Sequence, residues 1–296
     1  MEQGQNVSKG LTERKEVAEH MCVWDVKVLY LGKIRAPMSI LWPMGMPPLP
    51  DDFILDGPYL GFLLQSEGRN ILVDSGISEK FIVDGKAWSG LPAEGGRAYL
   101  EKALEKEGLN PADIDIVIYT HLHNDHAANC TLFTNARIIF QRDEWKNLLN
   151  PLPVQLLRRD YDLDVIPELK SMNTLMVDGD FKLTDGINIY KTPGHTLGSQ
   201  SIAVNTNKGV VVFTGDLFGL NFSAFPYLGE IIDMHGRKYS IPKAPPVFGP
   251  AVPVGGLVYD FYTYYDSVYK VKAIASRSEP GFIIPGHEGS LLVTGI

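Results

Sequence analysis

Short apolar runs separated by turn-forming residues dominate the chain from Val26 onward. Each run has the length of a β-strand and is bounded by glycine, proline, asparagine or aspartate, which favours strands over helices. We predict strands at 26–32, 59–65, 70–76, 115–120, 136–140, 187–191, 200–204 and 210–216, and a last strand followed by a loop within 281–289. Segment 36–52 is rich in proline and methionine, so we expect it to be irregular.

Helical spacing is seen in three stretches. In 97–110, Leu100 and Leu104 are four residues apart, glutamate and lysine fill the exposed positions, and Gly108 supplies a stop. A shorter helix at 142–150 ends before a proline, and 260–277 reads as a long helix. Runs of strands broken by occasional helices predict an α/β protein in which helices cover layers of sheet.

Composition limits the classes of protein that the chain can belong to. Its 296 residues carry a net charge of −8, which leaves no basic footprint for nucleic acid. Two cysteines are too few for a disulfide framework, and Cys130 reads as a small buried residue. Residues 1–22 read as a polar arm without a secretory signal, and 23–296 as a single domain. Without a long apolar run that could span a membrane, we expect a cytoplasmic protein.

One segment concentrates the chemistry. Within "YTHLHNDHAAN", at 119–129, stand His121, His123, Asp125 and His126, although the chain has seven histidines in all. Imidazole nitrogens and carboxylate oxygens are ligands of Zn²⁺ and similar metals. Because Asp125 and His126 are adjacent and point different ways, the spacing indicates two metals rather than one. A lone histidine in a turn is more often a solvated or hydrogen-bonded residue, so the metal hypothesis depends on further ligands elsewhere.

Three later segments supply such ligands. His195 lies in "TPGHTLGS", Asp216 ends the run "VVVFTGD", and His287 lies in "FIIPGHEG". Each segment repeats one design, in which an apolar strand leads through a glycine-containing turn to a metal-binding side chain. Five of the seven histidines therefore stand at predicted strand ends.

The ordered set T-H-x-H-x-D-H, G-H, G-D and G-H resembles the metallo-β-lactamase superfamily, from the "ILVDSG" strand through His287. The resemblance implies an αβ/βα sandwich with a dinuclear metal site at one edge. It also implies a ligand set: His121, His123 and His195 for one metal, Asp125, His126 and His287 for the second, and Asp216 as the bridge between them. Asp74, in "VDSG", matches a family position that supports a ligand through a hydrogen bond.

A metal pair of this kind predicts hydrolysis. A hydroxide bridging the metals would attack the carbonyl of a lactone or carboxylic ester, with Asp125 and Asp216 as catalytic carboxylates. The ligands suit Zn²⁺ best, although Fe²⁺, Mn²⁺ or Co²⁺ also fit. A glyoxalase II-like thioesterase and a phosphotriester or phosphodiester hydrolase are the alternatives. A non-catalytic metal scaffold would predict a lost ligand, and none of the seven is missing.

Among the branches of the superfamily, the chain is most similar to the quorum-quenching N-acyl homoserine lactonases. The similarity lies in "PYLGFLLQSEGRNILVDSG", in "AAN" after the cluster and in "YDS" within 260–277. One departure is Gly219, because those lactonases usually have a tyrosine there; Tyr227 is a candidate substitute. β-Lactamases of the commonest type carry cysteine where this chain has Asp216, and flavodiiron proteins carry an acidic residue at the position of His123.

The loops around the predicted site are apolar and aromatic. They include "SILWPMGMPP", "LFGLNFSAFPYLG" and the proline-rich segment 240–256. If they overhang the metals, they form a pocket for a small molecule with an apolar portion. We expect Phe218, Phe222 and Tyr227 to contact the substrate. The alternative is that these loops pack against a second copy in a homodimer.

Overall fold

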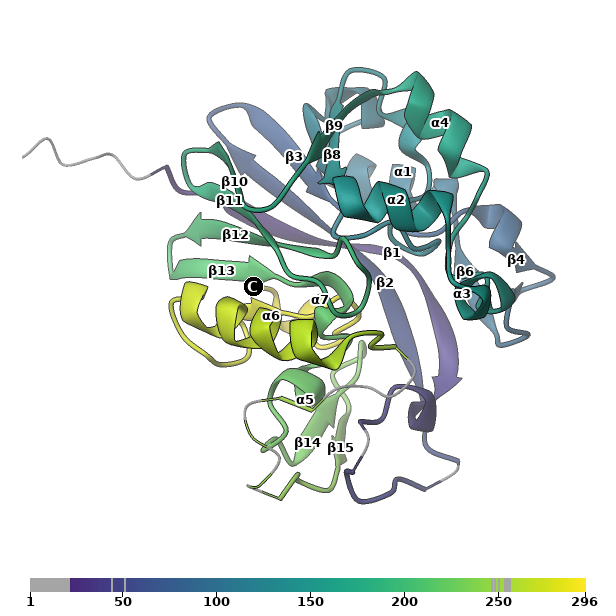
Figure 1. The fold of residues 1–296 in the computed structure, drawn as a ribbon, viewed down its shortest axis with the longest axis vertical. Helices are drawn as coiled ribbons and strands as arrows, with labels where there is room; N and C mark the ends of the chain where they lie inside the picture. The colour runs from purple at the N-terminus through teal and green to yellow at the C-terminus, as the bar shows by residue number, and fades with distance from the viewer. Residues whose placement is uncertain are drawn as a thin grey trace, which may run out of the picture.

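Two β-sheets face each other, and helices cover their outer surfaces (Figure 1). This arrangement is seen in a computed structural model, which describes residues 22–43, 45–50, 52–245, 247, 249, 251–252 and 257–296. The predicted αβ/βα sandwich is confirmed. The predicted polar arm at 1–22 lies outside the described residues except for Cys22, and the proline-rich segment 240–256 is described only in part.

The first sheet has seven strands in the order β6-β1-β2-β3-β7-β8-β9. Its strands are β1 (Asp25–Pro37), β2 (Ile54–Ser66), β3 (Arg69–Val73), β6 (Ala93–Gly95), β7 (Ile116–Ile118), β8 (Arg137–Gln141) and β9 (Asn173–Val177). Strands β3, β7, β8 and β9 are parallel to one another. Parallel pairing brings the carboxyl ends of these strands to one edge of the sheet.

The second sheet has five strands in the order β10-β11-β12-β13-β16. Its strands are β10 (Phe181–Thr184), β11 (Ile187–Lys191), β12 (Gln200–Thr206), β13 (Gly209–Phe213) and β16 (Ile283–Ile284). Two small ribbons lie outside the sheets: β4 (Ile82–Val83) with β5 (Lys86–Ala87), and β14 (Glu230–Ile232) with β15 (Lys238–Ser240). Strand β16 is parallel to β13, so these two strands also end side by side.

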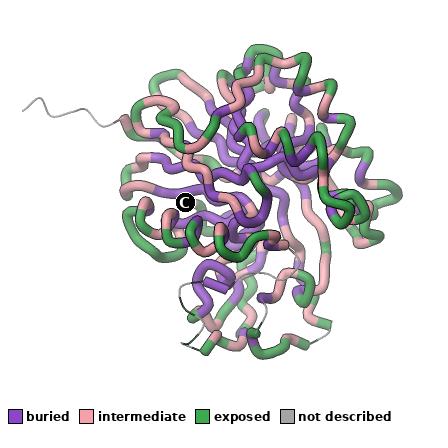
Figure 2. Tube along the Cα trace, viewed as in Figure 1, coloured by how far each residue is buried: buried purple, intermediate pink, exposed green. Residues whose placement is uncertain are grey.

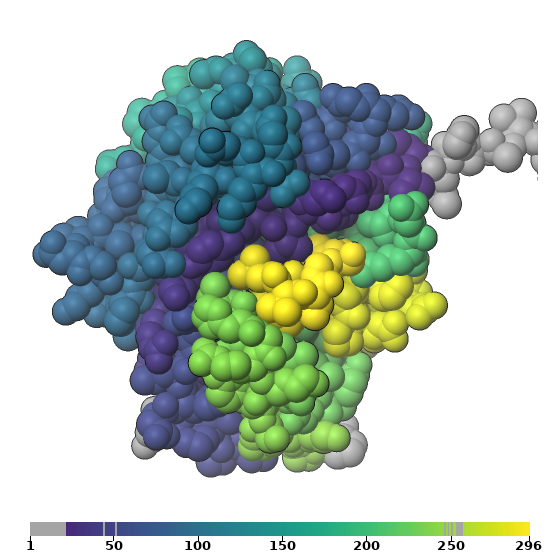
Figure 3. Space-filling model, turned by 180° about the vertical axis from the view of Figure 1, so that it is seen from behind, coloured from purple at the N-terminus to yellow at the C-terminus, as the bar shows by residue number. Residues whose placement is uncertain are grey.

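The helices are α1 (Arg97–Lys106), α2 (Arg142–Leu149), α3 (Pro153–Arg158), α4 (Val165–Ser171), α5 (Asn221–Ala224), α6 (Phe261–Ile274) and α7 (Leu291–Thr294). Short 3₁₀ turns occupy Met38–Ile40, Glu79–Phe81, Pro111–Asp113, Cys130–Leu132 and Gly215–Leu217. Figure 3 shows β1 running across the back of the molecule, with the C-terminal residues against it. None of the helices in the described ranges is long and apolar enough to cross a membrane.

Alternation along β2 explains how one strand serves two hydrophobic cores. Leu60, Phe62 and Leu64 belong to the core between the sheets, whereas Tyr59 and Leu63 belong to the core beneath the helices of the first sheet. This is the two-residue period that a pleated strand imposes on its side chains. Between the sheets, the rings of Phe62 and Phe213 lie 4.6 Å apart. Figure 2 shows the burial that results: β2, β8, β12 and β13 are buried along most of their length.

Several predicted boundaries shift where the chain enters the site. The strands predicted at 70–76 and 210–216 are shorter in the structure and end at Val73 and Phe213. The residues that follow, 74–76 and 214–216, lie outside the sheets. Strand β1 continues to Pro37, into the segment expected to be irregular. Helix α6 begins after Asp260, whose carboxylate accepts hydrogen bonds from the backbone N–H groups of Tyr262 and Thr263 and so caps the helix. Cys130 is buried, as predicted.

Candidate metal centre

The sequence-predicted ligands meet at one edge of the sandwich. Five strands lead to them: β3 to Asp74, β7 to the 121–126 cluster, β11 to His195, β13 to Asp216 and β16 to His287. Because β3 is parallel to β7, and β13 to β16, each pair delivers its following residues to the same edge. The fold therefore gathers residues that are more than 160 positions apart in the chain.

Among the described residues, three overlapping groups could hold a metal ion. They are His121–His123–His195, His121–His126–Asp216 and Asp125–His126–His287. Within each group the ligand atoms all lie within 4.8 Å of one another. All seven side chains predicted to bind metal are members of at least one group. The ligand roles themselves remain a proposal, developed below.

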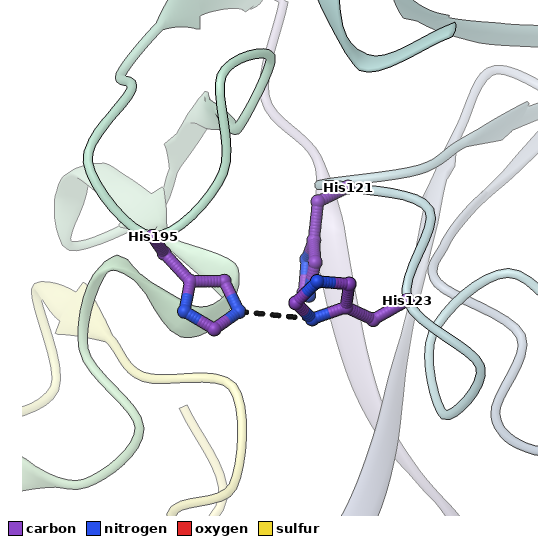
Figure 4. Close-up of side chains that lie close together, drawn as sticks. All are labelled: His121, His123 and His195. Carbon is purple, nitrogen blue, oxygen red and sulfur yellow. Dashed lines mark hydrogen bonds between the residues drawn. The ribbon is translucent and has the colours of Figure 1, made fainter. Parts of the chain in front are cut away.

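In the first group, three imidazoles converge. His195 Nε2 lies 3.1 Å from His123 Nδ1, and Figure 4 shows the two rings facing each other with His121 beside them. The ring centroid of His121 is 4.5 Å from that of His123 and 4.8 Å from that of His195. Nitrogen lone pairs that point at one small region are the arrangement that a metal ion with imidazole ligands requires.

The other two groups combine imidazoles with carboxylates. Asp216 Oδ1 lies 3.2 Å from His287 Nε2 and 3.4 Å from His126 Nε2. Asp125 approaches the same two imidazoles, with Oδ2 at 3.7 Å from His287 Nε2 and Oδ1 at 3.8 Å from His126 Nε2. The other oxygen of Asp216, Oδ2, lies 3.6 Å from His195 Nε2. Asp216 thus presents one oxygen to each group.

Hydrogen bonds on the far side of the rings fix how three imidazoles are oriented. The Nδ1 atom of His126 lies 2.8 Å from the Asp74 carboxylate. The Nδ1 atom of His195 lies 2.6 Å from the Leu257 backbone oxygen. The Nδ1 atom of His287 lies 2.9 Å from the Pro58 backbone oxygen. Each partner is an acceptor, so Nδ1 carries the proton and Nε2 keeps its lone pair. That is the tautomer with which a histidine binds metal through Nε2.

Asp74 itself occupies a strained backbone position. Its φ is +58°, a left-handed conformation that few non-glycine residues adopt. Its carboxylate accepts hydrogen bonds from the backbone N–H and the hydroxyl of Thr120, each at 2.7 Å, as well as the bond from His126. These contacts hold the strained residue in place and connect β3 to the histidine cluster, as expected where strain serves a site.

Among the histidines of the site, one pair has its pKa values lowered and another pair has them raised. Burial lowers the pKa of His121 and His123 well below the usual value, and neighbouring imidazoles lower it further. Burial also acts to lower the pKa of His126 and His287, but the nearby Asp216 and Asp125 carboxylates have the larger, opposite effect. The pKa of His126 is therefore raised, and the pKa of His287 rises to about 9. These carboxylates therefore attract positive charge, as a cation site must.

Unpaired polar atoms show that the residues present fit a bound cation. Within the part of the chain that the structure describes, no hydrogen-bond partner is found for the buried Nε2 atoms of His121 and His126 or for Asp216 Oδ1. Buried polar atoms without a partner are rare in folded proteins and call for an explanation. Coordination of a cation satisfies nitrogen and carboxylate lone pairs together. A Cβ at position 286 would lie 2.4 Å from Asp216 Oδ1, so Gly286 is needed beside this ligand.

A buried carboxylate ties the ligand loops together. Glu144, at the start of α2, has no exposed surface. Its Oε1 accepts from the Leu122 backbone N–H at 3.0 Å and from the Tyr161 hydroxyl at 2.9 Å. Its Oε2 accepts from the Thr196 hydroxyl at 2.6 Å and from the Gly198 backbone N–H at 3.1 Å. One side chain thus fixes the loop of His121 and His123 against the loop of His195.

We expect Glu144→Gln to lower the free energy of unfolding by about 2–4 kcal/mol. The amide keeps the shape of the side chain but replaces one accepting oxygen with an N–H₂ group, which faces a donor and leaves it buried without a partner. Urea unfolding of the variant and the wild type measures the difference. Glu101→Gln, on the surface of α1, is the control. A Glu144→Gln variant as stable as the control would contradict this role.

A cavity of about 510 Å³ opens onto the metal-binding groups. At one end it is lined by His123, Asp125, His195, Asp216 and His287. Much of the remaining wall is apolar and comes from segments far apart in the chain: Ile34, Ala36, Ile40, Leu41, Trp88, Leu91, Leu157, Leu217, Leu220, Leu257 and Val258. Such a cavity suits a small molecule that joins a hydrolysable group to an apolar portion.

The three predicted substrate residues are not among the described residues that line this cavity. Phe218 and Phe222 are 0% and 2% exposed and pack inside hydrophobic cores, whereas Tyr227 is 56% exposed. Their neighbours Leu217, Gly219 and Leu220 line the wall instead. The apolar pattern of this loop could not distinguish a side chain that faces the core from one that faces the cavity.

Sequence reasoning also missed cavity residues on other segments. Tyr59 on β2 and Trp88 after β5 line the wall, as do Leu157, Arg158, Arg159 and Asp160 around the end of α3. Leu157 is 85% exposed beside this cavity, and no local pattern in the sequence distinguishes it from other exposed leucines.

Comparison with known proteins finds a matching family model and several similar proteins. Residues 56–287 match the model of the metallo-beta-lactamase superfamily. The chain is 32% identical over 173 residues to an N-acyl homoserine lactonase from Bacillus cereus, and this match covers 55% of this chain and 65% of that protein. It is 30% identical over 159 residues to metallo-beta-lactamase domain-containing protein 1 from Xenopus laevis, covering 53% and 57%. The matches thus span less than two thirds of these curated relatives.

Solved structures with the same fold include an N-acyl homoserine lactone hydrolase with the product N-hexanoyl-L-homoserine bound at its catalytic metal centre. It has a TM-score of 0.67 and 23% identity, and the match covers 90% of this chain and 94% of that chain. A dizinc quorum-quenching lactonase has a TM-score of 0.62 and 18% identity, with 90% and 88% covered. These likenesses support the fold of the chain.

Proposed function

The chain belongs to the metallo-beta-lactamase superfamily, and from that premise we propose that it is a metal-dependent hydrolase of lactones or carboxylic esters. The observation that carries the proposal is the set of three overlapping histidine and aspartate groups at one end of a cavity with largely apolar walls. The similarity to N-acyl homoserine lactonases makes an acyl homoserine lactone, and with it quorum quenching, the favoured substrate assignment.

Two divalent cations, with zinc favoured, would be held by the seven side chains. His121, His123 and His195 would hold the first, Asp125, His126 and His287 the second, and Asp216 would contact both. Bound divalent metals supply Lewis-acid chemistry: they polarise a carbonyl oxygen and lower the pKa of water. Asp74 would support the second cation through His126, whose ring it orients.

Asp125 and Asp216 have different tasks in this proposal. Asp216 is held between His126, His195 and His287, so its position is fixed and its charge is balanced. The carboxylate of Asp125 is 20% exposed, and the residue lines the cavity. Asp125 is therefore the better placed of the two to receive a proton from the attacking water and to pass it to the leaving oxygen of the substrate.

Thioester hydrolysis is the second candidate, and one observation favours it. Arg158 and Arg159 line the cavity, so cationic groups are available for a substrate carboxylate. Arg158 Nε already donates to Asp160 Oδ1 at 3.0 Å, which offsets its charge. This pairing and the apolar wall rank the thioester below the lactone.

The test is a substrate panel with purified, metal-analysed protein. It holds N-acyl homoserine lactones of several chain lengths, simple aliphatic lactones, S-lactoylglutathione and an aryl phosphotriester. His123→Ala is run beside His235→Ala, which removes a half-exposed imidazole outside the three groups. We expect the wild type and His235→Ala to open lactones fastest, and His123→Ala to lose at least about a hundredfold in rate. Turnover of the thioester or phosphotriester alone would overturn the lactonase assignment.

We also propose that residues 23–296 form one hydrolase domain. The core between the sheets draws on β2 and β3 of the first sheet and on β11, β12 and β13 of the second, together with α6. Neither sheet could bury its inner face without the other.

A further inference from the structure

The hydroxyl of Tyr59 is an uncommitted polar group in the wall of the cavity. Tyr59 lies on β2, is 1% exposed and lines the cavity together with Asp125, Asp216 and His287. Its hydroxyl is buried and has no hydrogen-bond partner in the described ranges of the chain. Buried tyrosine hydroxyls usually find a partner, so an unpaired one beside a candidate active site needs a reason.

The position of Tyr59 is fixed relative to the metal-binding residues. The backbone oxygen of the preceding residue, Pro58, accepts the hydrogen bond from His287 Nδ1 at 2.9 Å. The ring of Tyr59 lies edge-on to the His287 ring, with centroids 6.3 Å apart and planes at 72°. The strand that orients His287 therefore also holds Tyr59 on the Asp125–His287 side of the cavity.

The Tyr59 hydroxyl keeps its proton at neutral pH, so it is able to donate a hydrogen bond. Burial raises the pKa of its hydroxyl well above the usual value, and the Asp125 carboxylate raises it further. The proton therefore stays on the oxygen. Two other polar side chains of the cavity wall already have partners: Trp88 Nε1 donates to the Arg158 backbone oxygen at 2.7 Å, and Arg158 Nε donates to Asp160. Gly219 offers no side chain at all.

We propose that the Tyr59 hydroxyl donates a hydrogen bond to an oxygen of the lactone or ester group undergoing cleavage. This inference rests on the proposed hydrolase function and adds to it a substrate-binding residue on the strand between the metal site and the apolar wall. A donor aimed at an oxygen that gains negative charge during the reaction is worth more in the transition state than in the ground state.

Tyr264 provides a matched control. It is also 1% exposed, and its hydroxyl likewise has no partner among the described residues, but it lies on α6 and does not line the cavity. Phenylalanine in place of either tyrosine removes one buried, unpaired hydroxyl and nothing else. Neither change leaves a donor or acceptor unsatisfied, so both variants should fold with a melting temperature equal to or above that of the wild type.

The test compares Tyr59→Phe, Tyr264→Phe and the wild type on N-hexanoyl homoserine lactone, with metal content and melting temperature measured on each. We expect Tyr59→Phe to lose about 10- to 100-fold in kcat/KM, with most of the loss in kcat, and Tyr264→Phe to stay within twofold of the wild type. Calorimetric titration with the product, N-hexanoyl homoserine, should show a Kd for Tyr59→Phe at least about threefold weaker, at unchanged metal content.

The outcomes separate the inference from the function on which it rests. If the wild type opens the lactone and Tyr59→Phe keeps kcat/KM and product Kd within twofold, the role of Tyr59 is overturned and the hydrolase proposal stands. If both variants lose activity equally, the effect is a general one of buried hydroxyls and the inference is again overturned. A wild type that cleaves no lactone or ester overturns the proposed function and this inference with it.

Discussion

Asp216→Ala is expected to lower lactone hydrolysis by about a thousandfold or more and to reduce the number of tightly bound metals per chain. Asp216 presents Oδ1 to His126 and His287 and Oδ2 to His195, so one substitution removes the carboxylate proposed to contact both metals. Residues that act as a unit in catalysis show losses of this size when any one of them is removed. Steady-state kinetics on a lactone, with elemental analysis of the same preparation, measures both effects.

The matched control is Asp178→Ala, which removes an exposed carboxylate paired loosely with Arg142 at 3.9 Å. It should keep full activity and full metal content. The substitution also removes the negative charge of the Asp216 carboxylate. Burial acts to raise the pKa of this group, but His287 and His126 hold that pKa well below its usual value. An Asp216→Ala protein with wild-type turnover and wild-type metal content would show that this carboxylate does not connect the two groups.

Removal of metal by a chelator is expected to abolish hydrolysis and to lower the melting temperature by about 5–10 °C. A ligand present at a hundred times its Kd stabilises the folded state by about 2.7 kcal/mol, and each kcal/mol corresponds to roughly 2–4 °C in a protein of this size. The structural reason is that cations would satisfy the buried Nε2 atoms of His121 and His126 and the Asp216 Oδ1 atom, which have no hydrogen-bond partner among the described residues. Calorimetric melting of the chelated and untreated protein measures the shift.

Restoration by added metal distinguishes this effect from damage by the chelator. Zn²⁺ added back to the dialysed protein should recover both the melting temperature and the activity, and Mg²⁺, which prefers oxygen ligands, should recover neither. Equal melting temperatures before and after chelation, with metal loss verified by elemental analysis, would contradict a metal that contributes to the stability of the fold.

The residues gathered at the site were predictable because each stands directly after a strand. The pattern of apolar run, turn and metal-binding side chain identified His195, Asp216 and His287 without any knowledge of how the strands pair. The structure then brings them beside the 121–126 cluster through the parallel pairings β3–β7 and β13–β16. Local sequence thus indicated the candidate ligands, and sheet topology explains why they meet.

The cavity was not predictable in the same way. Its wall combines Ile34, Trp88, Leu157 and Leu257, which are separated by long stretches of chain and share no local pattern. The apolar loop after Asp216 indicated a pocket but pointed to Phe218 and Phe222, which fill the core. Glu144 was missed for a similar reason: in sequence it is an ordinary acidic residue in the first turn of a helix, and only the folded chain shows four donors around it.

The most direct test of the account is a crystal structure of the purified protein with an anomalous difference map recorded at the absorption edge of its bound metal. We expect two peaks about 3.5–4 Å apart, one among His121, His123 and His195 and the other among Asp125, His126 and His287, with Asp216 in contact with both. A map with no peak at this edge of the sandwich, from protein that hydrolyses its substrate, would contradict the central claim.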